Sequence, residues 1–300
     1  MKYFILLLGI LSISLVTIFN FYPQETKRFL YNLFSNDEFI LATENNYFID
    51  NEYKYIKNYT DDPKNKEELL EYIYYVINSG STYADGECHK DYKDCLKDLN
   101  IIANDETTLS LLNNFVHPYN SFKSITITFN EYGKFSVVVE HIYKDEEIAT
   151  INYAVDEIFK NEINDSMTTE TKIKVIHDYI INNTEYDKLK TDDIHDPTYK
   201  SNTAYGVFIE GYGICSGYAD AIAIILNKLD IENYKICNDN HIWNLVHING
   251  VWTHLDATWN DPISKINQGR DTYFLIDYNK LAKLDDKSHS FNKNVYLEAY

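Results

Sequence analysis

The sequence predicts an α+β fold in which a helix that begins at a cysteine packs on an antiparallel sheet. The stretch GYGICSGYADAIAIILNKL, residues 211–229, places Cys215 directly before apolar residues at helical spacing. Farther along, ENYKIC, HIWNLVHI and VWTHLDATW each have the composition of a strand. Asn249 and Gly250 join the last two, and this dipeptide is typical of a two-residue hairpin turn because both residues tolerate a positive φ.

The composition is that of a globular protein with a substantial core. The chain has 300 residues, of which 45% are hydrophobic and 24% are charged, enough for one large or two modest domains. Its formal net charge is −19, from 46 acidic and 27 basic residues. Phosphate binding needs clustered cations, so this balance excludes nucleic acid as an expected partner.

The first residues have the character of a membrane segment. Tyr3 to Tyr22 carry no charge and are long enough to cross ~30 Å of hydrocarbon as a helix. A cleaved signal peptide would have a shorter apolar region and a small-residue cleavage site. We therefore expect residues 1–24 to be an uncleaved membrane anchor, with the rest of the chain outside the cytoplasm; the alternative is secretion after cleavage.

Cys88 and Cys95 are close in sequence and form the natural pair to consider in an oxidising compartment. Zinc would need two further ligands at suitable spacing, and His89 alone does not supply them. The sequence therefore leaves open a local disulfide or two free thiols, and favours either over a metal site.

Residues 36–150 are expected to form an N-terminal region that is mostly helical and then folds into a hairpin. EELLEYIYYVINSG spaces its apolar residues by three and four and stops at Gly80. SITITFNEYGKFSVVVEHIY then changes to a period of two on either side of residues 130–133, which predicts the hairpin.

Residues 151–300 are expected to form the second domain. INYAVDEIFKNEI and TTETKIKVIHDYII have helical spacing, and Thr168 is a plausible cap of the second helix. His177 in that helix is expected to be a packed or surface histidine. The polar stretch 186–199 contains Pro197 and predicts a loop of the kind that often borders active sites.

The hairpin turn sets a register in which every opposed pair has the same sum of residue numbers. His247 then faces Trp252, Leu245 faces His254, Trp243 faces Asp256 and His241 faces Thr258. One face is apolar and predicts a core surface. On the other face His241 and Asp256 are diagonal neighbours, ~7–8 Å apart at the backbone, so their side chains can meet. His254 is the rival partner, and His247, near the turn, is expected to be structural.

Cys215 lies at the amino end of its predicted helix, where unpaired N–H groups and the helix dipole favour a thiolate and can receive an oxyanion. Gly213 and Gly217 are expected to leave room for a substrate backbone. An imidazole and a carboxylate would complete a nucleophilic unit. A cysteine beside glycines is more often a small buried residue than a nucleophile. The hypothesis therefore depends on finding Cys215 together with the histidine–aspartate pair. Cys237 has no helix start after it and is interpreted as structural.

At these residues the sequence resembles the transglutaminase-like superfamily. The matching motifs are TAYGVFIEGYGICSGYADAIAIILNKLDI, NHIWNLVHINGVW and HLDATWNDP, with similarity extending upstream through MTTETKIKVIHDYIINNTEYD. The resemblance implies a papain-like core with Cys215 as nucleophile, His241 as base and acid, and Asp256 as the partner that orients the histidine. Nothing upstream of Cys215 stands out as a side-chain oxyanion donor, and no calcium site or other cofactor is expected.

The leading hypothesis is a thiol-dependent enzyme at the cell envelope that attacks a carboxamide or peptide bond of a protein or peptide and forms a thioester. Water as acceptor would give a peptidase or deamidase, and an amine would give a transglutaminase. Trp243 and Trp252 could form an apolar wall that favours the amine, or could be core. The alternatives are a catalytically silent binding or scaffold module, and a metal site at Cys237 and His241, which lacks obvious further ligands.

Overall fold

The computed structural model describes residue positions 26, 31, 33, 38–50, 59–193, 195–261, 269–284 and 287–300. By their contacts these residues form two compact units. The first unit comprises residues up to Leu109 together with Phe122–His141, and the second unit comprises Ser110–Ser121 together with Ile142–Tyr300. The expected domains 36–150 and 151–300 stay a prediction, because contacts alone do not show which parts fold independently.

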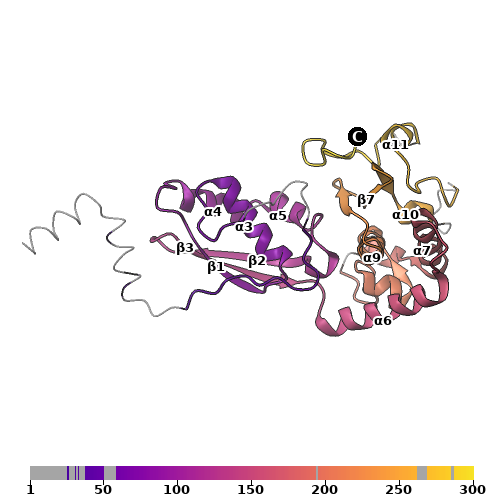
Figure 1. The fold of residues 1–300 in the computed structure, drawn as a ribbon, viewed down its shortest axis with the longest axis horizontal. Helices are drawn as coiled ribbons and strands as arrows, with labels where there is room; N and C mark the ends of the chain where they lie inside the picture. The colour runs from indigo at the N-terminus through magenta and orange to yellow at the C-terminus, as the bar shows by residue number, and fades with distance from the viewer. Residues whose placement is uncertain are drawn as a thin grey trace, which may run out of the picture. The chain divides into compact units, whose positions relative to one another are not determined.

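The first unit is a helix-covered antiparallel sheet (Figure 1). Its strands are β1 (Tyr83–Glu87), β2 (Phe122–Phe129) and β3 (Lys134–His141), in the order β1-β3-β2. The hairpin of β2 and β3 confirms the prediction for this stretch. Strand β1 was not predicted within this part of the chain, which was expected to be mostly helical. Five residues are too few for a clear period-two signal, and pairing with β3 decides the conformation.

Among the helices whose bounds the structure describes, α3 (Lys66–Asn78) and α4 (Cys95–Ala103) lie wholly in the first unit. α3 begins at the cap Asn65 and ends before Gly80, whose φ is +77°. Its residues Leu69 to Asn78 are almost all buried, as the apolar spacing predicts. α4 follows, and its first residue, Cys95, forms a disulfide with Cys88. The structure thus chooses the disulfide from the alternatives that the sequence left open. α5 (Glu106–Leu112) leads out of this unit and into the second.

The second unit surrounds one buried helix, α9 (Cys215–Lys228), in which every residue from Gly217 to Leu226 is buried. A single apolar stripe was expected, but α9 is enclosed on all sides. α6 (Asp145–Glu162) and α7 (Thr169–Asn183) are long helices of this unit, and the hydroxyl of Thr168 accepts from the Thr171 N–H at 3.2 Å, which confirms the predicted cap. α7 packs on α9, as Figure 1 shows.

A second antiparallel sheet lies against α9. It consists of β6 (Asn233–Cys237), β7 (Ile242–Ile248) and β8 (Val251–Leu255), in that order. The predicted register is confirmed from Ile248 opposite Val251 to Leu245 opposite His254, and both turn residues have a positive φ, +53° and +76°. The ladder ends at Asn244 and Leu255, so the two further pairs that were predicted do not form.

Both faces of this sheet are buried, whereas the sequence predicted one core face. Asn244 points to α9, because its side-chain amide donates to the Ala219 carbonyl at 2.9 Å. The opposite face carries Trp243 and His254, and the carboxyl-terminal residues cover it: the Phe291 ring lies 6.4 Å from the first and 5.8 Å from the second, between centroids. Short elements complete the unit: η1 (Pro118–Asn120), β4 (Glu185–Tyr186), α8 (Lys188–Asp192), η2 (Gly206–Glu210), β5 (Tyr212–Gly213), α10 (Ala257–Asn260) and α11 (Tyr278–Leu284).

A buried ion pair fixes α9 within the second unit. Lys235 of β6 donates to Asp220 Oδ1 at 2.6 Å, and each side chain is only 6% exposed. The hydroxyl of Tyr143 donates to Asp220 Oδ2 at 2.7 Å and accepts from the Ala204 N–H at 2.8 Å. One carboxylate on the second turn of α9 therefore ties this helix to the sheet and to the segment before η2.

Among the residues that the structure describes, no helix is both long and apolar enough to span a membrane. The predicted anchor, residues 1–24, lies outside the described residues.

The disulfide should stabilise the first unit, since it removes conformational freedom from the unfolded chain. The double variant Cys88→Ser/Cys95→Ser should lose about 2–3 kcal/mol of the free energy of unfolding. The measurement is urea unfolding followed by far-UV circular dichroism, with and without a reducing agent. The reducing agent should lower the wild-type midpoint and leave the double variant unchanged; an unaltered wild-type midpoint would contradict the prediction.

Asp220→Asn should lower the free energy of unfolding of the second unit by about 3–5 kcal/mol, because it leaves the Lys235 ammonium buried without its counter-charge. All three tryptophans lie in this unit, so their fluorescence reports its unfolding in urea. The matched control is Asp156→Asn, whose carboxylate pairs with Lys228 at 2.5 Å at the surface. That change should cost less than about 1 kcal/mol, and equal effects of the two changes would be evidence against this role of Asp220.

Candidate active site

Cys215 is the first residue of α9, as predicted, and its side chain is partly exposed. The residue before it, Ile214, has extended backbone (φ −110°, ψ 176°) and supplies no side-chain cap to the helix. The N–H groups of the first turn are therefore not satisfied by a cap from that residue, and they carry the positive end of the helix dipole. A thiolate and an oxyanion are both stabilised at such a position.

The glycines on either side of Cys215 do not open a path for substrate, so that prediction was wrong. A Cβ on Gly217 would lie 2.2 Å from the Ser201 carbonyl oxygen, and a Cβ on Gly213 would lie 2.7 Å from the ring of Tyr218. Both glycines allow close packing of the protein on itself. They let segment 201–203 and the Tyr218 ring pack tightly against the start of α9.

His241 and Asp256 meet, although neither lies in the sheet ladder. His241 precedes β7, and its backbone N–H is held at 3.0 Å by the side-chain oxygen of Asn238. Asp256 follows β8 and caps α10, with Oδ1 accepting from the Trp259 N–H at 3.1 Å. Its own backbone N–H donates to the Tyr273 carbonyl instead of to β7. The helix cap therefore replaces the predicted cross-strand pairs and still turns the carboxylate toward His241.

The imidazole of His241 lies between the carboxylate and the thiol. Its Nε2 is 2.6 Å from Asp256 Oδ2, and Cys215 lies close enough to the ring to contribute to the raised pKa of the imidazole. Burial alone would lower the pKa of His241, but the charge and hydrogen bond of Asp256, together with Cys215, raise it to about 10. Burial would raise the pKa of Asp256, but the two histidines that face it hold that pKa well below its usual range. The site thus favours an imidazolium beside a carboxylate.

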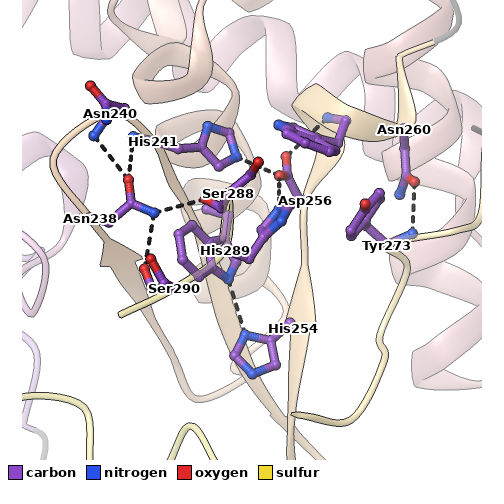
Figure 2. A network of polar contacts seen from close by, with 12 residues as sticks. Asn238, Asn240, His241, His254, Asp256, Asn260, Tyr273, Ser288, His289 and Ser290 are labelled. Atoms are coloured by element: carbon purple, nitrogen blue, oxygen red, sulfur yellow. Dashed lines mark hydrogen bonds and ion pairs between the residues drawn. The ribbon is translucent and has the colours of Figure 1, made fainter. Parts of the chain in front are cut away.

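The structure adds a second histidine that the sequence did not single out. His289 Nε2 donates to Asp256 Oδ2 at 2.8 Å, to the same oxygen that faces His241 (Figure 2). The His289 side chain is buried, with its ring stacked on Tyr273 at 4.8 Å between centroids and edge-on to Trp259 at 4.8 Å. Asp256 therefore receives three N–H donors in a site from which water is excluded.

The other histidines of the sheet have structural environments. His254, the predicted rival, accepts from the indole of Trp243 at 3.0 Å and donates to the Ala299 carbonyl at 3.0 Å, and burial lowers its pKa to about 4. It is neutral and does not reach Asp256. His247 pairs with Glu232 and stacks on Trp252 at the turn end of the hairpin.

His177 is buried in α7, as the packed interpretation expected. Its Nδ1 is 3.1 Å from Asp178 Oδ1, and its Nε2 accepts from the Asn260 amide at 3.1 Å. The amide oxygen of Asn260 in turn accepts from the Tyr273 N–H at 2.9 Å. His177 therefore supports the end of α10, one turn after Asp256.

A cleft of about 820 Å³ opens beside His241. Of the predicted aromatic wall, Trp252 packs on Tyr234 near the hairpin turn, while Trp243 is 1% exposed and stacks under the His241 ring at 5.6 Å. Trp259 is the tryptophan that lines the cleft. The lining residues come from four segments of the chain: Tyr186, Lys188, Thr191, Asp192, Asn238, Asp239, Asn240, His241, Thr258, Trp259, Lys287, Ser288 and Ser290.

Tyr186 is a lining residue whose pKa responds to the charges of Cys215 and Asp256. It was expected in a loop but lies in β4, which pairs with β5, and Tyr186 is opposite Gly213, two residues before Cys215. Burial raises the pKa of Tyr186; a hydrogen bond from Thr191 opposes this, and the charges of Cys215 and Asp256 add to it. The phenol therefore stays protonated near the thiol and can donate a hydrogen bond there.

His241, Asp256 and His289 also offer atom types that bind transition metals, and the three atoms lie within 4.8 Å of one another. Each imidazole N–H is already donated to the carboxylate oxygen, at 2.6 and 2.8 Å. A metal could enter only after both protons left and the three groups moved apart. Cys237 has other contacts: its sulfur is 3.2 Å from the Asn114 amide and 3.3 Å from the Tyr296 hydroxyl.

Three residues of the site escaped prediction for different reasons. Trp259 follows Asp256 at the spacing of a helix cap, a signal that the strand pattern of VWTHLDATW concealed. Tyr186 acquires its position only through the two-residue pairing of β4 with β5. His289 lies 33 residues after Asp256 in a stretch without periodicity, so nothing in the sequence pointed to it.

Solved structures resemble the chain only distantly. A crystal structure of a TGase shares 14% identity over 46% of this chain and 44% of its own, with a TM-score of 0.34. A candidate cysteine protease from Cytophaga hutchinsonii shares 16% identity over 45% of this chain and 61% of its own, with a TM-score of 0.28. The chain thus spans less than two thirds of either protein, and likeness at this level carries no argument about activity. No curated protein matches the chain.

The family comparison is more specific. The model of the transglutaminase-like superfamily matches residues 157–257, which include α7, α9 and the whole β6-β7-β8 sheet. Cys215, His241 and Asp256 all lie within the match, and His289 lies beyond it. Residues 157–257 thus form a transglutaminase-like part of the chain.

Proposed function

We propose that the protein is a thiol-dependent enzyme that transfers acyl groups from carboxamide or peptide bonds of proteins or peptides, through a thioester on Cys215. One observation carries the proposal: a partly exposed cysteine at the amino end of α9 lies beside an imidazole whose Nε2 is 2.6 Å from a buried carboxylate. Neither a cysteine nor a histidine–aspartate pair alone would support it.

The first half-reaction follows from this arrangement. The Cys215 thiolate attacks the carbonyl carbon, a C–S bond forms, and the carbonyl oxygen takes the negative charge. The His241 imidazolium donates its Nδ1 proton to the leaving nitrogen as the C–N bond breaks. Asp256 keeps His241 oriented and stabilises its charged form throughout.

Two kinds of donor can receive the oxyanion. The backbone N–H groups at the start of α9 point along the helix axis toward Cys215. Tyr186 lines the cleft beside His241, and its raised pKa keeps its hydroxyl protonated at neutral pH. We assign to Tyr186 the side-chain donor role that the sequence left empty.

The acceptor of the second half-reaction decides the product. His241 removes a proton from water or from an amine, the acceptor attacks the thioester, and the C–S bond breaks to restore the thiolate. Water gives a peptidase or deamidase, and an amine gives a cross-link. Trp259 is the only tryptophan lining the described cleft, whose other residues are largely polar, so the cleft admits either acceptor.

We further propose that the protein works at the cell envelope. The disulfide of the first unit supports this location, because disulfides persist in oxidising compartments and are rare in reducing ones. The proposed anchor at residues 1–24 is consistent with it. The test is to separate cells of the native source into envelope and cytoplasmic fractions without a reducing agent and to assay the disulfide-bonded chain in each. The proposal predicts that this chain is found in the envelope fraction, and its recovery in the cytoplasmic fraction would contradict the proposal.

Iodoacetamide alkylation followed by mass spectrometry tests the nucleophile. Cys215 should react at pH 6 about tenfold or more faster than Cys237, since an ordinary thiol with a pKa of ~8.5 is almost fully protonated there. The His241 pKa of about 10 predicts a charged imidazolium up to that pH and its loss above it, so acyl transfer should fall as the pH rises through about 10. His241→Gln should abolish the advantage of Cys215. Equal labelling rates of Cys215 and Cys237 would contradict the enzyme proposal and favour a catalytically silent binding module.

Tyr186→Phe tests the proposed oxyanion donor independently of the nucleophile Cys215. Alkylation passes through no oxyanion, so the rate of Cys215 labelling should stay within about twofold of wild type. Turnover of an acyl donor found by screening peptides should lose about 10²-fold or more in kcat, the usual effect of removing one oxyanion donor. Unchanged turnover in Tyr186→Phe would remove this residue from the mechanism without affecting the assignment of Cys215.

A further inference from the structure

The Asp256 carboxylate has more hydrogen-bond donors than a histidine-orienting partner requires. Oδ1 accepts from the Trp259 N–H at 3.1 Å, and Oδ2 accepts from His241 at 2.6 Å and from His289 at 2.8 Å. The carboxylate is 2% exposed and the His289 side chain is 1% exposed, so water does not compete for these bonds. The second imidazole is therefore a built part of the environment of Asp256.

Asn238 connects the two histidines through their backbones. Its side-chain oxygen accepts from the N–H groups of Asn240 at 2.9 Å and of His241 at 3.0 Å. Its amide nitrogen donates to the carbonyl oxygens of Ser288 at 2.8 Å and Ser290 at 3.0 Å, the residues on either side of His289 (Figure 2). One asparagine thus sets the start of β7 and the carboxyl-terminal segment in a fixed relation, with Asp256 between their histidines.

The aromatic packing of His289 sets the direction of its N–H group. Tyr273 stacks on the ring, while Trp259 and Trp243 contact it edge-on with centroids 4.8 and 4.9 Å away. The ring of His241 is also perpendicular to it, at 5.2 Å. An apolar ring would fill this space equally well, so packing alone does not explain a histidine whose Nε2 points to the carboxylate.

We propose that His289 is a positioning residue for acyl transfer: by donating Nε2–H to Asp256 Oδ2, it holds this carboxylate ionised and oriented toward His241. The proposal rests on the proposed function of Cys215 and His241. It extends the active site beyond residues 157–257, since Ser288 to Ser290 lie outside the superfamily match. The carboxyl-terminal segment is then part of the catalytic machinery as well as a cover for the sheet.

The loss of His289 should change the pKa of Asp256 in a definite direction. The titratable groups that face Asp256 are His241 before β7, His289 on the carboxyl-terminal segment, and Tyr186 of β4, with Cys215 of α9 beyond the imidazole. His289 is one of the groups that lower the pKa of Asp256. Removing the His289 N–H must therefore raise the pKa of Asp256. The carboxylate then becomes protonated at a higher pH than in the wild type, and below that pH it no longer stabilises the His241 imidazolium.

The test is a pair of substitutions of nearly equal shape in the full chain. His289→Gln keeps an N–H donor the same number of bonds from the backbone, and His289→Met removes it. The readout is the rate of Cys215 alkylation from pH 4 to pH 9. In the methionine variant Asp256 stays ionised but has one donor fewer, so its hold on the His241 imidazolium that supports Cys215 weakens. The acid limb of alkylation should therefore move up by about one pH unit, and the rate at a fixed pH on that limb should fall about tenfold, the worth of one hydrogen bond to a charged group. The glutamine variant should stay within about threefold of wild type.

A control and a second measurement keep the test decisive. His254→Gln alters a buried histidine that does not touch Asp256 and should leave the acid limb unchanged. Equal acid limbs in His289→Met and wild type would overturn the proposal, whereas slow Cys215 labelling in the wild type itself would overturn the proposed function. If the methionine variant does not fold, ¹⁵N spectra of the wild type decide: His289 must keep its Nε2 proton throughout the reactive pH range, and an unprotonated Nε2 would overturn the role.

Discussion

The buried carboxylate of Asp256 is the group on which the site depends. Removing a carboxylate from water costs several kcal/mol unless donors and opposite charge replace the solvent. Here the backbone of Trp259 and the rings of His241 and His289 replace it. The same contacts that make the burial tolerable also aim the carboxylate, so its stability and its orienting action have one physical cause.

Each of these three donors comes from a different part of the second unit, so the site forms only when these parts are packed together. β7 brings His241, the short helix α10 brings the Trp259 N–H, and the carboxyl-terminal segment brings His289. Covering the outer face of the sheet is what allows that last segment to reach Asp256. The Lys235–Asp220 pair holds α9 against the inner face of the sheet, and this fixes the position of Cys215 relative to His241.

Local sequence patterns predicted a large part of this arrangement. The apolar period that follows Cys215 placed the start of α9, and the residues Asn249 and Gly250 fixed the register of β7 and β8. These features depend on short-range physics: helix periodicity, turn conformation and the alternation of a strand. The meeting of His241 with Asp256 followed from them, although the strand end at Leu255 and the cap at Asp256 changed the route.

What the sequence did not predict depends on contacts between distant segments. Strand β1 and the pair β4–β5 are too short to show a period, and partner strands determine their conformation. The roles of Gly213 and Gly217 were misjudged, because a small residue signals close approach without identifying what approaches. His289 reaches Asp256 through the fold of the carboxyl-terminal segment, which carries neither periodicity nor a motif.

The charge state of His241 is the most direct test of this interpretation. ¹⁵N spectra of histidine-labelled protein, assigned by comparison with His241→Gln, report the protonation of both ring nitrogens as the pH is raised. We predict that His241 remains an imidazolium at pH 8 and loses its proton near pH 10, in keeping with its raised pKa. A neutral His241 ring at pH 8 in the folded wild type would contradict the charged pair on which the proposed chemistry rests.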